Sequence, residues 1–379
     1  MSKVALVRCE SYEFGAVRAA VQRGIDLLGG VQNYARTGER ILLKANLLVG
    51  DAPEKCVNTH PSVLRAVAEI FKTTGAQITY GDSPAIGTAR AAGKKIGIDL
   101  AAHEAGIELR EFQPGQEVHF PEGVQNKRFT IARAVMESDG IVSLPKLKAH
   151  GMQKFTGCVK NQFGCIPGLL KGEFHVRLPD AHAFARMLVD LDRLVHPRLY
   201  IMDGITAMEG NGPRGGTPRR MNVLLFSEDP IAADATVCRL IDLAPLLVPT
   251  IAFGQAAGRG THEKEKIELL GDDFDSFRCP DFVIDRAAIK PYKEQGVLRF
   301  VSNRLVPKPV IDKEKCIRCG LCVTVCPAHP KALDWRQGDR TQPPAHDYRS
   351  CIRCYCCQEL CPENAIALKK PLLRRVLNF

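Results

Sequence analysis

The chain has 379 residues, of which 45% are hydrophobic and 25% charged, and its formal net charge is +10. At roughly 150 residues per domain, this length predicts two or three globular domains. No apolar run approaches the roughly 20 residues of a membrane helix, and the first residues lack a signal peptide's apolar stretch and cleavage site. We therefore expect a cytoplasmic protein with no stable membrane insertion.

Residues 1–298 alternate between strand-like and helix-like stretches, and we predict that they form one domain. Apolar runs that stop at Gly, Asp or Pro predict strands within 3–8, 40–48, 77–84, 140–145 and 198–204. Helices are predicted within 16–30 and 59–75, the second with Thr59 as its N-cap. The alternation predicts an α/β fold in which helices cover both faces of a layered, largely parallel sheet.

Polar side chains follow several of these predicted strands. Ligands of open α/β sheets bind at the carboxyl ends of the strands. The candidate ligand-binding residues at these ends are Lys44, Asn46, Asp82, Lys146, Lys148 and Asp203. Together they predict a pocket at one edge of the sheet.

Residues 144–164 hold the densest group of candidate site residues: Lys146, Lys148, His150, Lys160 and Asn161. Ammonium groups beside glycine-flanked backbone N–H groups bind carboxylates and phosphates, so this segment predicts an anion site. His150 is the candidate for proton transfer. The alternative is a solvated basic loop.

Residues 210–215 read GNGPRG, a formal match to the G-x-G-x-x-G pattern of dinucleotide-binding sites. That pattern must directly follow a strand and open a helix. Here residues 205–209 intervene and Pro213 lies inside the loop, so we do not expect a nicotinamide dinucleotide. The loop is flanked by Asp203 and Glu209 and is a candidate to bind a small ligand or a hard cation through oxygens.

Six stretches of this domain resemble the uncharacterised iron–sulfur family named domain of unknown function 362. They are KANLL (44–48), GDSP (81–84), LPKLKAH (144–150), TGCVKNQFG (156–164), DGITAMEGNGP (203–213) and SEDPIAADA (227–235). The family often has proline where this chain has Ala45 and usually a non-thiol residue where it has Cys158, which leaves open a thiol near the predicted pocket. The resemblance implies an α/β domain joined to iron–sulfur clusters and supplies no reaction.

A linker at 299–309 leads to a small α+β ferredoxin-like domain at 310–370, and a basic, apolar tail follows at 371–379. The small domain contains C-x2-C-x2-C-x3-C-P twice, 35 residues apart. This is the bacterial ferredoxin run for a 4Fe–4S cluster, and its fourth cysteine binds the other cluster. We therefore predict two 4Fe–4S clusters, one on Cys316, Cys319, Cys322 and Cys361 and the other on Cys326, Cys351, Cys354 and Cys357.

Seven of the fifteen cysteines lie outside these eight positions. Cys356 aligns with Leu321 of the first run, so it is the predicted spare thiol of the second. The other six are scattered along the chain, as in proteins of reducing compartments.

Two functions fit these features. The first is an oxidoreductase that passes electrons through two 4Fe–4S clusters to a small anionic substrate or cofactor in the α/β domain. The second is a non-enzymatic electron carrier, or a maturation or docking partner of another redox enzyme. A pocket that opens towards a cluster would favour the first, and both require a redox partner protein. Purely structural clusters are a third, weaker reading.

Nucleic acid is not an expected partner, despite the positive net charge. Residues 310–379 contain twelve Lys and Arg against seven Asp and Glu. Each oxidised 4Fe–4S cube with four thiolates adds about −2, which brings this region close to neutral.

Overall fold

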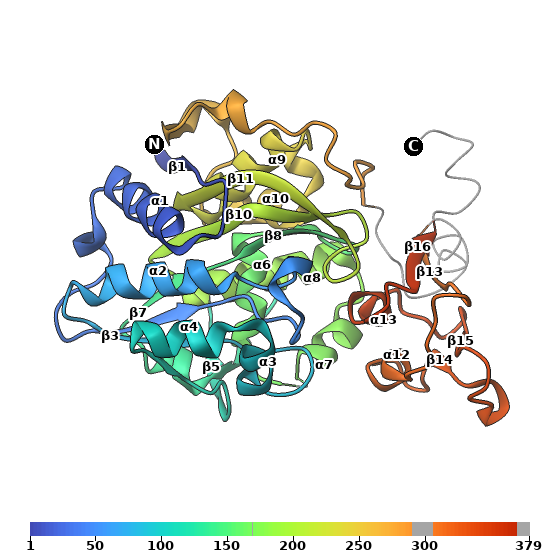
Figure 1. Ribbon diagram of the computed structural model, residues 1–379. Helices are drawn as coiled ribbons and strands as arrows, with labels where there is room; N and C mark the ends of the chain where they lie inside the picture. The colour runs from blue at the N-terminus through green and yellow to red at the C-terminus, as the bar shows by residue number, and fades with distance from the viewer. Residues whose placement is uncertain (169, 290–305, 370–379) are drawn as a thin grey trace.

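The structure is a computed structural model that describes residues 1–168, 170–289 and 306–369. Figure 1 shows a large domain built around a sheet and a small domain, drawn in red, at its side. The predicted tail at 371–379 and residues 299–305 of the predicted linker lie outside the described residues. Strand β13 begins at Lys308, two residues before the predicted start of the small domain.

The large domain is organised by a ten-stranded sheet in which β12-β1-β11-β10-β7-β2-β3-β4 form the main path and β8 and β9 extend from β10. Six strand pairs are parallel, whereas β11 runs antiparallel to β1 and β10, and β9 runs antiparallel to β8. The strands are β1 (Ser2–Arg8), β2 (Arg40–Lys44), β3 (Gln77–Gly81), β4 (Glu108–Leu109), β7 (Gly140–Ser143), β8 (Lys146–His150), β9 (Lys154–Thr156), β10 (Leu199–Glu209), β11 (Thr217–Ser227) and β12 (Ile267–Gly271). A separate hairpin joins β5 (Gly115–His119) to β6 (Arg128–Ala132).

Two hydrophobic cores lie on opposite faces of this sheet. Successive strand residues point to opposite faces, so Ala5 and Val7 join one core while Val4 and Leu6 join the other. The first core is covered by α1 (Phe14–Leu27), α2 (Pro61–Lys72), α3 (Ala89–Ile96) and α4 (Ile98–Ala105). The second is covered by α8 (Ala181–Val195), α9 (Pro230–Leu240) and α10 (Pro249–Ala256), with α5 (Arg133–Met136) beside them. The predicted α/β fold with helices on both faces is confirmed.

One local prediction is wrong, and one alternative is excluded. Thr59 is not the N-cap of α2: the cap is His60, whose ring Nδ1 accepts the backbone N–H of Ser62 at 3.2 Å. Thr59 is buried instead, and its hydroxyl donates to the backbone oxygen of Leu144. The alternative of a solvated basic loop after Pro145 is excluded, because residues 146–150 form the buried strand β8 beside β10.

The small domain contains two copies of one structural unit. Helices α12 (Leu321–Thr324) and α13 (Cys356–Glu359) occupy equivalent positions of the two cysteine runs. The antiparallel pair β13 (Lys308–Ile311) and β16 (Ile366–Lys369) brings the two ends of the domain together. A second pair joins β14 (Leu333–Asp334) to β15 (Ala345–His346). Across the described parts of both domains, the helices are too short or too polar to cross a membrane.

Candidate functional site

The glycine-rich loop 210–215 is where the small domain docks on the large one. The Gln358 side-chain amide of α13 donates to the backbone oxygens of Asn211 (3.0 Å) and Gly212 (3.1 Å). Gly212 is required here, because a Cβ atom would lie 2.0 Å from the Ala149 oxygen. Glu209 does not face a ligand site, since its carboxylate accepts the backbone N–H of Val283 at 2.9 Å. The loop that matched a dinucleotide pattern is thus a domain contact.

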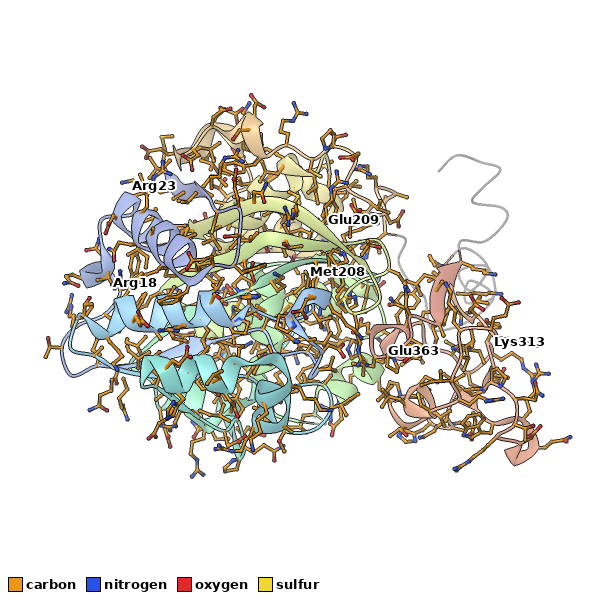
Figure 2. The ribbon with its side chains drawn as sticks, in the orientation of Figure 1. Arg18, Arg23, Met208, Glu209, Lys313 and Glu363 are labelled. Atoms are coloured by element: carbon orange, nitrogen blue, oxygen red, sulfur yellow. The ribbon has the colours of Figure 1, made fainter. Side chains whose placement is uncertain are left out.

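An ion pair and a small apolar cluster complete this contact. The Arg214 guanidinium binds both oxygens of Asp51, at 2.6 and 2.9 Å, and also donates to the Leu360 backbone oxygen at 2.6 Å. Met208 packs with Leu360 of the small domain. Figure 2 shows Met208 and Glu209 at the end of β10 that faces the small domain, and Glu363 on the near side of that domain.

A cleft of about 790 Å³ lies between the two domains. We call it the interdomain cleft. Its large-domain wall includes five predicted site residues together with two that the sequence did not indicate; these seven are Asn46, Asp82, Lys148, Lys160, Asn161, Lys171 and His175. Its small-domain wall includes Cys326, Cys356 and Glu359. In Figure 1, α7 (Leu170–Arg177) faces α12 and α13 across this region.

The large-domain wall of the cleft is positively charged and poorly solvated. Lys148 is 1% exposed and donates to the Asn46 side chain at 2.7 Å. Burial, reinforced by the charge of Lys160, holds the pKa of Lys148 well below its usual range. Burial also lowers the pKa of Lys171 to about 8, although this ammonium donates to both oxygens of Ser83.

Lys148 and Lys171 both donate hydrogen bonds to neutral oxygens, whereas Lys160 is the lysine of this wall without such a partner among the described residues. Within the described residues its ammonium makes no hydrogen bond or ion pair, and it lies 5.8 Å from the centre of the Phe163 ring. Desolvation lowers its pKa, and the charge of Glu359 across the cleft opposes that shift. An ammonium group in this state is suited to bind an anion.

The short helix that carries Lys160, α6 (Cys158–Asn161), is capped at its first residues by a buried carboxylate. The buried Asp234 carboxylate of α9 accepts the backbone N–H of Cys158 at 2.7 Å and that of Val159 at 3.4 Å. Gly157 permits this approach, because a Cβ there would lie 2.2 Å from the Asp234 oxygen. Burial raises the pKa of Asp234 to about 7. Two of the family-like stretches, TGCVKNQFG and SEDPIAADA, therefore meet at this helix, and Cys158 is buried beneath it rather than exposed in the cleft.

Lys44, Lys146 and Asp203 lie outside the cleft lining, in buried ion pairs. Lys44 Nζ is 2.8 Å from Asp82 Oδ1. Lys146 Nζ is 2.8 Å from Asp203 Oδ2 and donates to the Tyr12 hydroxyl at 2.7 Å, which itself donates to Asp203 at 2.8 Å. The predicted convergence of Lys146 with Lys148 and Lys160 on one anion is not what the structure contains: the acid opposite Lys146 on β10 already neutralises it.

His150 lies beside Glu359, which lines the cleft, and is not itself among the lining residues. Its Nδ1 accepts the backbone N–H of Met152 at 3.1 Å, which leaves Nε2 to carry the proton, 3.1 Å from Glu359 Oε1. Burial holds the pKa of His150 well below its usual range and raises that of Glu359. The β8 sequence KLKAH thus points three basic side chains to one face, each towards a different partner.

The eight cysteines of the two runs line two separate small cavities. One is lined by Cys316, Cys319, Cys322 and Cys361, which we call the outer set. The other is lined by Cys326, Cys351, Cys354 and Cys357, the inner set. This is the grouping that the interleaved rule predicts, and Cys356 lines neither cavity.

The two sets differ in exposure. In the outer set Cys319 is exposed and the other three cysteines are partly exposed. In the inner set Cys351, Cys354 and Cys357 are buried, and Cys326 lines the interdomain cleft. Burial and the neighbouring thiols raise the pKa of Cys357 well above its usual value. No three His, Cys, Asp or Glu side chains of the described segments converge on a single metal ion; a 4Fe–4S cube instead takes four separate thiolates.

Several site residues were missed by sequence reasoning. Lys171 and His175 follow the predicted anion segment, but they lie in the helix α7 and follow no apolar run that would predict a strand end. Glu359 lies between Cys357 and Cys361, and the cysteine pattern gives no indication of a functional acid there. Asp234 belongs to the family-like stretch SEDPIAADA. Its role as a cap of α6 depends on the packing of α9 against α6, which the sequence does not indicate.

Two family models match the chain. One is described as domain of unknown function (DUF362) and matches residues 41–239. The other is described as a 4Fe-4S dicluster domain and matches residues 308–362. A thylakoid-associated protein of Synechocystis sp. is 36% identical over 259 residues, which are 68% of this chain and 80% of that protein.

Two solved structures align with part of this chain at low identity. The lactate racemase apoprotein from Thermoanaerobacterium thermosaccharolyticum is 14% identical with a TM-score of 0.41, and the match covers 64% of this chain and 56% of that one. A protein from Thermotoga maritima is 10% identical with a TM-score of 0.35, and the match covers 63% of this chain and 59% of that one.

Proposed function

Because this chain belongs to the DUF362 family and carries a 4Fe-4S dicluster domain, we propose that it is an iron–sulfur oxidoreductase whose substrate or cofactor is a small anion bound in the interdomain cleft. Two 4Fe–4S clusters, one on the outer and one on the inner cysteine set, supply one-electron transfer when bound.

One observation carries the proposal: a single cleft has unpaired positive charge on one wall and a cluster cysteine on the other. Lys160 and Cys326 both line it. A carrier that only exchanges electrons with other proteins needs no such cleft, and a volume of about 790 Å³ lies within the usual range for small-molecule sites.

The residues of the cleft have distinct roles in this proposal. Lys160 binds the anionic group. Burial and the charge of Lys160 disfavour the charged form of the nearby Lys148, and a bound anion favours that form again. Asn46 and Asn161 fix the wall through their hydrogen bonds to Lys148 and to Ser143. Glu359, backed by His150, is the candidate acid for a substrate that takes up protons with its electrons. The low-dielectric walls strengthen each of these interactions.

A redox partner protein exchanges electrons at the outer set, where Cys319 is exposed. We place the protein in a reducing compartment, the cytoplasm, because seven cysteines lie outside the two cluster runs and most of them are scattered singly along the chain.

The test is anion-dependent stabilisation of the anaerobic, cluster-loaded protein. Phosphate, sulfate and small carboxylates are titrated while the melting temperature of the large domain is followed by circular dichroism. Saturation of the site at 100 times the dissociation constant adds about 2.7 kcal/mol of stability. Lys160→Met should abolish this gain while the iron content stays unchanged.

Lys94→Met is the matched control, because Lys94 is an exposed lysine of α3 outside the cleft lining. This variant should respond to anions as the parent does. An equal response in the Lys160 and Lys94 variants, or no response in the parent to any anion of the panel, would favour the electron-carrier function instead.

A further inference from the structure

The internal repeat of the small domain contains a matched pair of arginines. Arg318 and Arg353 each occupy the third position of the tetrapeptide CIRC, 35 residues apart. Their backbones adopt the same left-handed conformation, with φ angles of 56° and 59°. The two residues therefore have the same sequence context and the same backbone conformation.

Their surroundings differ. Arg318 is exposed and donates to the Thr341 backbone oxygen at 2.8 Å. Arg353 is 2% exposed, and none of its three guanidinium nitrogens has a hydrogen-bond partner among the described residues. Its nearest aromatic contact is the Tyr348 ring, with 5.2 Å between Cζ and the ring centre. A buried, unpaired guanidinium is strongly unfavourable unless an anion offsets it.

The inner cysteine set supplies that anion. Arg353 lies between Cys351 and Cys354 in the sequence, and its guanidinium is close enough to the Cys351 thiol for its charge to act there. A 4Fe–4S cube with four thiolates carries about −2 when oxidised and one negative charge more when reduced. A fixed positive charge beside it therefore favours the reduced form, whereas the low solvent exposure of the inner set disfavours that form.

We propose that Arg353 is a redox-tuning residue that raises the reduction potential of the inner cluster, so that electrons arriving at the outer cluster are drawn towards the interdomain cleft. This inference rests on the proposed function, since it requires a cluster on each cysteine set. The transfer moves one electron from the outer to the inner site, with no bond broken and no proton moved. The reduced redox partner protein replaces the electron lost by the outer site.

The experiment is a redox titration of the anaerobic holoprotein, followed by electron paramagnetic resonance, in the parent, Arg353→Gln and Arg318→Gln. A lanthanide chelate added to the solution broadens the signal of the exposed outer cluster more strongly and so identifies the inner one. Arg353→Gln should make reduction of the inner cluster at least tenfold less favourable, which is about 59 mV for one electron. Arg318→Gln should change either potential by less than half of this, because solvent screens its charge.

Unchanged potentials in an Arg353→Gln protein that retains both clusters would overturn the inference. If Arg353→Gln retains only the outer cluster, Arg353→Lys decides: two clusters with a parental inner potential support the role of the charge, and loss of the inner cluster here too refutes it. The parent tests the proposed function separately, because about four irons and one signal in the parent would remove the two-cluster assignment itself.

Discussion

The buried Lys146–Asp203 pair gives the sharpest test of which predicted site residues are structural. Lys146 is 1% exposed and Asp203 0% exposed, and the carboxylate also accepts the Tyr12 hydroxyl at 2.8 Å and the His60 backbone N–H at 3.1 Å. Asp203→Asn leaves the Lys146 ammonium buried without a counter-charge. Breaking a buried pair in this way costs about 3–5 kcal/mol of unfolding free energy.

The reverse change, Lys146→Met, should cost less than Asp203→Asn. The carboxylate that it leaves behind keeps three hydrogen-bond donors, the Tyr12 hydroxyl and the backbone N–H groups of His60 and Ile205. The double variant should be less destabilised than the sum of the two single variants by about 1–3 kcal/mol, because neither charge is then left alone. Anion-dependent stabilisation should survive in Lys146→Met, since this ammonium is absent from the cleft lining.

The assay is urea unfolding of the anaerobic holoprotein, followed by far-ultraviolet circular dichroism. Glu209→Gln is the control, because Glu209 is a partly exposed acid of the same strand that accepts one backbone N–H. It should cost less than about 1 kcal/mol. The reasoning fails if Asp203→Asn costs no more than this control, or if the two single effects simply add.

Three further predictions follow from the same structure. Because burial raises the pKa of Asp234 to about 7, the folded protein keeps a proton that the unfolded chain has lost above about pH 4. The free energy of unfolding should therefore fall by about 2 kcal/mol as pH rises from 5.5 to 7 and then level off. Asp234→Asn should remove this slope in urea unfolding. Anaerobic reconstitution should give about eight irons and eight sulfides per chain in the parent and in Cys356→Ser but fewer in Cys357→Ser; equal iron loss in both variants would show that the repeat register is wrong. Arg214→Met removes the paired guanidinium that joins Asp51 to the small domain, so backbone hydrogen exchange in α13 should become about tenfold faster or more while that in α2 stays unchanged; unchanged exchange in α13 would mean that this pair does not hold the domains together.

The sequence by itself determined the features that depend on short-range spacing. The two cysteine runs predict which four thiols belong together, and the two cavities of the small domain group them in that way. The alternation of apolar runs and helices predicted the layered α/β sheet, because strand and helix periods are local properties of the chain. Polar residues at strand ends predicted a pocket, and five of the predicted residues line the interdomain cleft: Asn46, Asp82, Lys148, Lys160 and Asn161.

Only the tertiary structure decided which of the charged residues are available. Lys146 and Lys160 look equivalent in the sequence, yet the partners of Lys146 are Asp203 and Tyr12, 57 and 134 residues away along the chain. The GNGPRG loop had a dinucleotide pattern, and its actual contact is Gln358, 146 residues from Gly212. Arg318 and Arg353 share one tetrapeptide and one backbone conformation, and they differ only in what covers them. The free energy of a charge depends on its solvation and on its nearest opposite charge, and both are set by segments that the chain brings together only when it folds.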